Sequence, residues 1–143
     1  MSYIDENLLP DEHVVYRAAL HWIIFARAIL VLVGGLVLVF VPGAALVVLL
    51  VGAVMLVPPF VAYRTTELGV TNKRVIVKTG LVQRRTLELL LRQVEAISVD
   101  QSLLGRVFGF GSITLTGTGG VREVFHRVGD PLELRRRIHG QVA

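Results

Sequence analysis

The feature that most constrains this chain is a run of 36 residues, from Ala28 to Tyr63, without a single charge. Leucine, isoleucine, valine, phenylalanine and methionine dominate the run, and Pro42-Gly43 lies in its middle. One helix of this length would be far longer than the roughly 20 residues that cross a bilayer core. We therefore predict a transmembrane helical hairpin over residues 20–63, with helices at about 20–41 and 42–62 and a tight Pro-Gly turn.

The energetics of membrane insertion favour this hairpin over a soluble core. Residues 28–41 hold 11 strongly apolar side chains, and residues 44–57 hold 10. At roughly 0.3–0.6 kcal/mol each they contribute about 3–6 kcal/mol per segment, against at most ~3 kcal/mol for Arg27. The alternative is a buried helix pair in a soluble protein, but a chain this small could not cover two helices that are apolar all round.

Several residues indicate the depth of the predicted helices in the bilayer. Trp22 and Tyr63 are about equally far from the turn, so we predict that both rings anchor the hairpin at one membrane interface. Gly34-Gly35 and Gly52-Ala53 also fall at similar depth, where small residues would let the backbones approach closely, although glycine is common in membrane helices generally. Arg27 is expected to snorkel to the phosphates, with a functional charge inside the membrane as the alternative.

The distribution of lysine and arginine predicts the orientation of the hairpin. The Pro-Gly turn is uncharged, whereas cations flank the opposite ends of both helices, so we expect both termini in the cytoplasm. The first residues are acidic where a secretory signal is basic, so we expect no cleaved signal peptide. Pro58-Pro59 removes helix donors, and we expect the second helix to kink or loosen there.

Residues 64–143 change character and have the pattern of short antiparallel strands between turn signals. Thr79-Gly80 is predicted to be a tight hairpin turn, because glycine tolerates a positive φ. The cytoplasmic N-terminal segment, residues 1–19, has strand character at 12–19 and could add an edge strand. The other predicted strands are Thr66–Val70, Arg74–Lys78, Leu81–Leu90, Ala96–Gln101, Ser112–Gly117 and Arg122–Val128.

A change of period then predicts a C-terminal helix. Asp130-Pro131-Leu132-Glu133 has the pattern of an N-cap, a first-turn proline and an acidic third position. Leu134, Ile138 and Val142 follow at intervals of four and form one apolar stripe. The predicted fold class is therefore α+β, a transmembrane hairpin plus an antiparallel β-barrel that the C-terminal helix caps.

The residues that follow the hairpin resemble the bacterial pleckstrin-homology-like family of the membrane-anchored type. The resemblance covers about residues 63–141, and a preceding hairpin is typical of that family. It implies a PH-like barrel with a C-terminal helix and implies no activity. We carry over no lipid-binding residues from eukaryotic relatives. The residues that carry it are Leu68 to Ile76, Gly80-Leu81, Arg85, Val94 to Ile97, Gln101 to Arg106, Gly109 to Gly111 and Asp130-Pro131.

We find no catalytic motif in the sequence, and we predict neither an enzyme nor a cofactor or metal site. Without cysteine there is no thiol nucleophile or cysteine-zinc site. The four histidines, His13, His21, His126 and His139, have no partner at metal-ligand spacing. Residues 117–120, Gly-Thr-Gly-Gly, superficially resemble a phosphate-binding loop, but they lack the following lysine and helix, and a hairpin turn is the better interpretation.

Basic residues are concentrated in the part of the sequence that follows the predicted hairpin. Residues 64–143 carry 13 of the 15 basic residues and 7 of the 11 acidic ones. Because the domain is expected to be tethered at a membrane, anionic lipid headgroups are the obvious counter-charge, and a merely solvated surface is the alternative. Nucleic acid is not expected, since stacking aromatics are missing. The predicted lipid contacts are Arg27, Arg64, Lys73, Arg74, Arg84, Arg85, Arg135, Arg136 and Arg137.

One Gly-rich apolar segment, residues 103–110, is a candidate for partner contact. Its large side chains would lie in a loop that either packs into the barrel or on the bilayer, or forms a protein interface. The residues concerned are Leu103, Leu104, Val107, Phe108 and Phe110.

These features together predict a function without chemistry. We expect a non-catalytic interaction or scaffolding module in a bacterial inner membrane, whose partners are the lipid bilayer and either further copies of the chain or other membrane subunits. A sensor of anionic lipid headgroups is the alternative. A small lipid-modifying enzyme would need a polar cleft that the sequence does not indicate.

Overall fold

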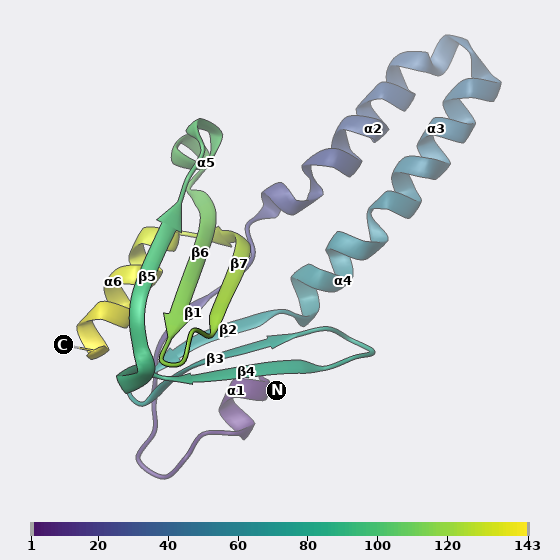
Figure 1. Cartoon of the computed structure of the whole chain (residues 1–143). Helices are drawn as coiled ribbons and strands as arrows, with labels where there is room; N and C mark the ends of the chain where they lie inside the picture. Colours follow the sequence, from purple (N-terminus) through teal and green to yellow (C-terminus); the bar gives the residue numbers. More distant parts are fainter. Residues whose placement is uncertain (1, 143) are drawn as a thin grey trace. The chain divides into compact units, whose positions relative to one another are not determined.

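The computed structural model describes residues 2–142, which divide into two compact units (Figure 1). The hairpin unit is Trp22–Arg64. The sheet unit combines the residues up to His21 with those from Thr65 onward. The sheet unit is therefore built from two segments of the chain that flank the hairpin.

The hairpin unit consists of two helical arms. The first arm contains 3-10 helix η1 (Trp22–Phe25), α2 (Ala26–Val37) and 3-10 helix η2 (Leu38–Phe40), and the second contains α3 (Pro42–Met55) and α4 (Val57–Thr65). Pro42 is the first residue of α3, where its missing N–H would have had no helical partner. Gly43 is helical, so the chain reverses at Val41 and not at the predicted Pro-Gly pair.

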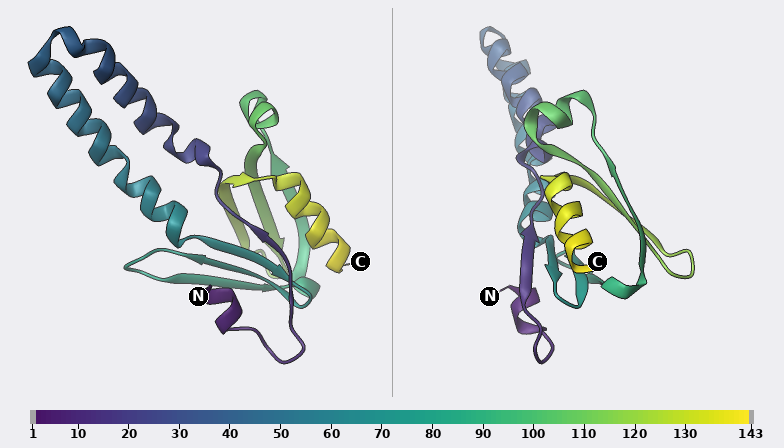
Figure 2. Two further views of the ribbon diagram at one scale, coloured as in Figure 1. Left: turned by 180° about the vertical axis from the view of Figure 1, so that it is seen from behind. Right: turned by 90° about the vertical axis from the view of Figure 1, so that its left-hand side faces the viewer.

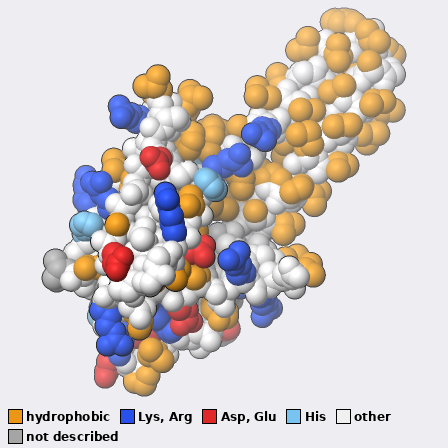
Figure 3. All heavy atoms as spheres, in the orientation of Figure 1, with side chains coloured by type: hydrophobic (Ala, Val, Ile, Leu, Met, Phe, Trp, Pro, Cys, Tyr) orange, Lys and Arg blue, Asp and Glu red, His pale blue; other side chains and the backbone are white. Residues whose placement is uncertain are grey.

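The outer surface of the hairpin unit is apolar. By length and composition alone, Trp22–Phe40 and Pro42–Thr65 are long and apolar enough to cross a membrane. Large side chains such as Leu30, Val37 and Phe40 are exposed on it. Figure 3 shows the visible face of these helices covered with apolar side chains.

Small residues bring the two arms together. Gly35 on α2 and Gly52 on α3 are both buried. A Cβ added to Gly35 would lie 2.9 Å from Leu49 Cδ2 and 3.3 Å from the Leu49 backbone nitrogen, and Gly52 meets Leu32 in the same way at 2.7 and 3.3 Å. Each glycine thus admits a leucine of the opposite arm. A Cβ on Gly34 would meet nothing within 4 Å, so the predicted role of small residues applies to Gly35 and Gly52 and not to Gly34.

The prolines of the second arm separate two helical segments. The α3 helix ends at Met55 and α4 begins at Val57, so Pro58 and Pro59 lie in the first turn of α4. Prolines are tolerated there because first-turn amides have no intrahelical acceptor. The amide of Phe60 again donates to the Leu56 carbonyl, at 3.0 Å, and the helix continues.

Among residues 2–142, seven antiparallel strands form two sheets, where a single barrel was predicted. The first sheet has the order β1-β2-β3-β4 and the second the order β5-β6-β7. The strands are β1 (Val14–Ala18), β2 (Glu67–Thr71), β3 (Arg74–Thr79), β4 (Arg85–Leu90), β5 (Val94–Asp100), β6 (Phe110–Gly117) and β7 (Arg122–Gly129).

The two sheets are joined along one side by the chain that follows β1. Leu20 forms an isolated antiparallel bridge with Val128. Around it, the Gly129 amide donates to the Ala19 carbonyl at 2.9 Å, and the His21 amide to the Arg127 carbonyl at 2.8 Å. Between β4 and β5 the 3-10 helix η3 (Leu91–Gln93) makes the other connection. Pairing between the sheets is thus confined to a short bridge, and no closed barrel forms among the described residues.

Helix α6 (Pro131–Val142) covers the core between the sheets. It contacts β1, β5, β6 and η3, and Figure 2 shows it lying along them. Leu134 and Ile138 of its predicted apolar stripe are fully buried with Val70, Val75 and Ile113 of the strands. Val142, the third residue of that predicted stripe, is exposed. Because each large buried aliphatic side chain contributes about 1.5–3 kcal/mol, this helix is an integral part of the core.

Two predicted local structures differ from those observed. Strand β4 begins at Arg85 and not at Leu81. Thr79 pairs with Arg85, so Gly80 to Arg84 form a five-residue loop in place of the predicted tight turn. Gly80 does have the expected positive φ, +91°. The predicted Gly-rich loop at 103–110 instead contains a short helix, α5 (Leu103–Phe108), which leads into β6.

The N-terminal segment covers the outer face of the first sheet. Alternate residues of β2, Leu68 and Val70, point into the core, and Gly69 points outward. Helix α1 (Tyr3–Glu6) lies over this outer face (Figure 2), and Ile4 is 1% exposed there. A Cβ on Gly69 would lie 2.6 Å from Ile4 Cδ1, so the glycine makes room for this side chain.

Candidate interaction surfaces

Arg74 is buried, so the prediction that it contacts lipid headgroups is wrong. Its side chain is 8% exposed and forms ion pairs with Glu12, at 3.0 Å, and with Glu88. It also donates to the backbone carbonyl of Asn7 at 2.7 Å. Arg74 fastens the N-terminal segment to strand β3, and its role is structural.

Glu12 is the partner that the sequence did not reveal. Its carboxylate is fully buried and accepts hydrogen bonds from the Thr71 hydroxyl at 2.6 Å, the Leu9 amide at 2.7 Å and two guanidinium nitrogens of Arg74. The only signal in the sequence was an acidic residue directly before a strand-like stretch. Nothing in its spacing pointed to a cation more than sixty residues away, since only the β1–β2–β3 order brings them together.

The surroundings of this ion pair shift both partners toward their charged forms. Burial alone would raise the pKa of Glu12, but the hydrogen bonds from Arg74, Thr71 and Leu9 outweigh it and hold the pKa below its ordinary value. The hydrogen bond to Glu12 raises the pKa of Arg74 despite burial. The pKa of Glu67 is also lowered. Burial would raise it, but hydrogen bonds from Ser2 and from the amides of Tyr3 and Ile4 outweigh burial.

The remaining predicted lipid contacts are exposed and spread over both units. Arg27 and Arg64 belong to the hairpin unit, where Arg64 lies over the Phe60 ring, 5.8 Å from its centroid. Lys73 donates to the Pro10 carbonyl at 2.6 Å, and Arg85 lies 3.8 Å from Glu123. Several of these cations therefore already have a partner within the chain.

The arginines of α6 differ in their pairing. Glu133 accepts from Arg137 at 2.8 Å and from Arg136 at 3.4 Å, and Arg137 also lies over the Tyr16 ring. Arg135 on the same helix has no ion-pair partner within residues 2–142, and the same is true of Arg84 in the β3–β4 loop. Both cations are therefore available to an external anion, and Arg27 of the hairpin unit likewise has no ion-pair partner within residues 2–142.

The predicted anchors lie on the two arms of the hairpin. Trp22 and Tyr63 are both exposed, and the Phe25 ring packs 5.7 Å from the Tyr63 ring. Trp22 begins the first arm and Tyr63 lies near the end of the second. Both aromatic residues thus belong to the ends of the helices that are remote from the turn.

Helix α5 contains most of the predicted partner-contact residues. Leu103, Leu104 and Val107 are 81%, 63% and 76% exposed, and Phe108 is partly exposed. Figures 1 and 2 show α5 beyond the ends of β5 and β6. Phe110 does not belong to this exposed group, because it is the first residue of β6 and its ring lies 5.3 Å from the His21 ring.

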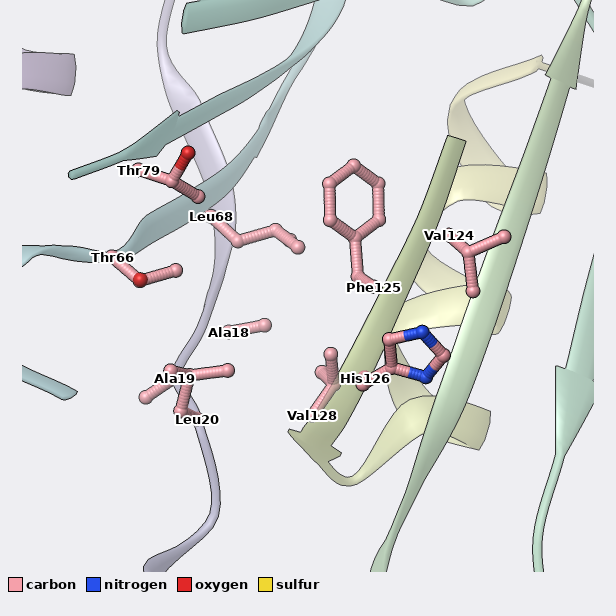
Figure 4. Close-up of a pocket in the computed structure, with 10 residues that line it drawn as sticks. All are labelled: Ala18, Ala19, Leu20, Thr66, Leu68, Thr79, Val124, Phe125, His126 and Val128. Atoms are coloured by element: carbon pink, nitrogen blue, oxygen red, sulfur yellow. The ribbon is translucent and has the colours of Figure 1, made fainter. Parts of the chain in front are cut away.

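A small apolar cavity lies in the sheet unit between β1, β2 and β7. Its volume is about 190 Å³, and Leu20, Leu68, Phe125 and Val128 supply much of its wall (Figure 4). Thr66, Thr79 and His126 are also among the residues that line it. The cavity includes both residues of the Leu20–Val128 bridge in its wall, and no sequence pattern indicated it.

Two polar side chains of the second sheet lie close together. His126 Nδ1 lies 3.1 Å from the Ser112 hydroxyl on the exposed side of the second sheet. Over residues 2–142, no three side chains of histidine, aspartate or glutamate come together in a way that could hold a metal ion.

Comparison with known proteins identifies the type of domain. The sequence profile described as "Bacterial PH domain" matches residues 23–142. The crystal structure of a DUF1696 family protein with a pleckstrin-homology domain from Shewanella loihica PV-4 is 14% identical, covers 55% of this chain and 71% of its own, and superposes with a TM-score of 0.42. No curated protein matches the chain.

Proposed function

This chain belongs to the bacterial PH domain family, and we propose that it is a membrane-anchored, non-catalytic interaction module of a bacterial inner membrane. The observation that carries the proposal is the apolar outer surface of the hairpin unit. In water such a continuous surface would drive association. In a bilayer it is the surface that faces lipid, and the backbone polar groups are already paired within the helices.

The strand pairing supports a topology with both termini on one side. Val14 to Ala18 pair with β2, and Leu20 pairs with β7, although the hairpin separates these segments in the sequence. Both must therefore be on the same side of the membrane, which requires an even number of crossings. The excess of cations in residues 64–143 favours the cytoplasmic side.

Single cysteines test this topology, because the chain has none of its own. In spheroplasts, a membrane-impermeant maleimide is expected to label Phe40→Cys at the turn of the hairpin. It should label Thr118→Cys, in the β6–β7 turn, only after lysis. Labelling of Thr118→Cys in intact spheroplasts, or release of the chain by alkaline carbonate, would contradict the proposal.

A second candidate function is the sensing of anionic lipid headgroups, and the exposed Arg84 and Arg135 favour it. Each such cation near an anionic leaflet contributes about 1 kcal/mol. Native mass spectrometry of the chain from equal parts of phosphatidylglycerol and phosphatidylcholine should show retained phosphatidylglycerol. Arg135→Gln should reduce that retention more than Arg136→Gln, whose guanidinium already pairs with Glu133. Equal retention in both variants would contradict headgroup sensing by α6.

The same spectra report the partners of the module. We propose that it works as a homo-oligomer or as an accessory subunit of a membrane complex, because a non-catalytic domain tethered to a membrane acts by binding a partner. More than one copy, or a co-purified membrane protein, is the expected result. A lone monomer that also gives no crosslink in cells would contradict this part of the proposal.

A further inference from the structure

We propose that α5 inserts into the headgroup region of an anionic bilayer, as a second membrane contact in addition to the hairpin. The inference rests on the proposed membrane anchoring. It assigns the exposed α5 tip, defined as Leu103, Leu104 and Val107, to lipid and not to another protein.

The exposure of the α5 tip is the first observation. These three large aliphatic side chains have most of their surface in solvent, whereas Gly105 on the same helix is buried. A Cβ on Gly105 would lie 2.5 Å from the Phe110 carbonyl oxygen, so the helix is held closely against the start of β6. Its apolar side chains consequently point away from the sheet unit.

The local hydrogen bonds make this tip suitable for an apolar environment. The Ser102 hydroxyl caps the helix by accepting from the Gly105 amide at 3.1 Å, and the Ser102 carbonyl accepts from the Arg106 amide at 3.0 Å. At the other end, Gly109 is in the left-handed conformation and donates to the Gly105 carbonyl at 2.8 Å. These bonds pair part of the α5 backbone, which lowers the cost of moving the helix into a less polar environment.

The size of the tip favours a bilayer over a protein partner. A stable protein interface buries about 800 Å² on each partner and involves roughly 20–30 residues a side. Three side chains on a helix of fewer than two turns fall well short of that. An interfacial wedge needs only a small apolar surface that sinks a short distance between headgroups.

Charge supports an anionic membrane as the occupant. Arg106 is exposed on α5 itself. The hollow beside it has no excess of positive charge, because Arg106 and Arg136 line it together with Asp130 and Glu133. Glu133 is already paired with Arg136. Residues 64–143 carry 13 basic against 7 acidic residues, so the domain as a whole is attracted to an anionic surface.

A fluorescent depth measurement on the full-length chain tests the proposal. Leu104→Cys, Thr118→Cys and Val47→Cys would each carry one NBD label in vesicles of equal parts phosphatidylcholine and phosphatidylglycerol. Position 104 is expected to give brighter, blue-shifted emission that nitroxide-labelled lipids quench. Position 118, at the opposite end of β6, should stay in water, and position 47 on α3 should be quenched at greater depth.

Each other outcome has a definite meaning. Lipid quenching at position 47 but not at 104 would overturn insertion of α5 while leaving the membrane anchor intact. Quenching at neither position would contradict the proposed function as well. A label at position 104 that is shielded from water but not quenched by lipid would mean a protein contact and would also overturn the proposal. Loss of quenching at 104 in pure phosphatidylcholine would support the role of charge.

Discussion

Replacement of Arg74 by alanine is expected to lower the free energy of unfolding by about 3–5 kcal/mol, because it leaves the carboxylate of Glu12 buried without a counter-ion. Arg74 also links Asn7 and Glu88 to strand β3, so the N-terminal segment should loosen with it. The change is measured by urea unfolding of the full chain in a mild detergent, followed by circular dichroism.

Arg136→Ala is the matched control, since it removes an exposed guanidinium that is paired with Glu133 at 3.4 Å. Exposed pairs of this kind contribute about 0–1 kcal/mol. The double variant Glu12→Leu with Arg74→Met should recover much of the loss, because well-packed apolar residues often replace a buried pair at little cost. If Arg74→Ala changed stability no more than Arg136→Ala, the buried ion pair would not hold the N-terminal segment in place.

The pH dependence of stability offers a second readout of the same pair. The pKa of Glu12 is lower in the folded chain than in the unfolded one, so its contribution is fully present above the ordinary glutamate pKa of about 4.3. That contribution is lost as the pH falls through the lower, folded pKa. Glu12→Gln should therefore reduce the loss of stability in acid without abolishing it. The pKa of Glu67 is also lowered in the folded chain, so Glu67 contributes to the same loss.

Replacement of Gly35 by leucine is expected to push the two arms of the hairpin apart. Even its Cβ would lie 3.3 Å from the backbone nitrogen of Leu49, which cannot move as a side chain can. Overpacking of this kind costs about 1–3 kcal/mol, and the loss of the Leu49 contact adds to it. Titration with dodecyl sulfate, followed by helicity, should show unfolding at a lower detergent fraction.

Gly34→Leu provides the control, because this neighbouring glycine has nothing within 4 Å of an added Cβ. It removes a glycine from the same helix without entering the contact between the arms. The reciprocal variant Gly52→Leu should behave like Gly35→Leu, since Leu32 fills its place. Equal effects of Gly34→Leu and Gly35→Leu would argue against close packing of the arms.

The predictions from sequence succeeded where a pattern has a single cause. The uncharged run predicted two apolar helices, and the i, i+4 spacing of Leu134 and Ile138 predicted the buried face of α6. The strand predicted at Ser112–Gly117 lies within β6, but Thr114 is buried there together with Ile113 and Leu115. These patterns reflect contact with solvent and the local geometry of helices. They can therefore be interpreted without knowing which elements pack against them.

Features that depend on distant residues were not predictable. Lysine and arginine runs suggest a cationic surface, but Arg74 is buried because β1 and the N-terminal segment bring Glu12 to it. The separation of the sheets, and with it the cavity near Phe125, depends on where β7 pairs with the chain around Leu20. The short helix α5 was hidden by its glycines, which here serve as a cap and as a close contact.

The division of the sheet unit between two chain segments has a consequence for biosynthesis. Strand β1 and Glu12 leave the ribosome before the hairpin, but their partners on β2 and β3 follow only after it. If the hairpin spans a membrane as proposed, an insertion error that left just one helix across the bilayer would keep the two halves in different compartments, with Arg74 unneutralised and a sheet edge open. Under the proposed function, correct membrane topology is then a precondition of folding, and misinserted chains would be unfolded substrates for proteolysis.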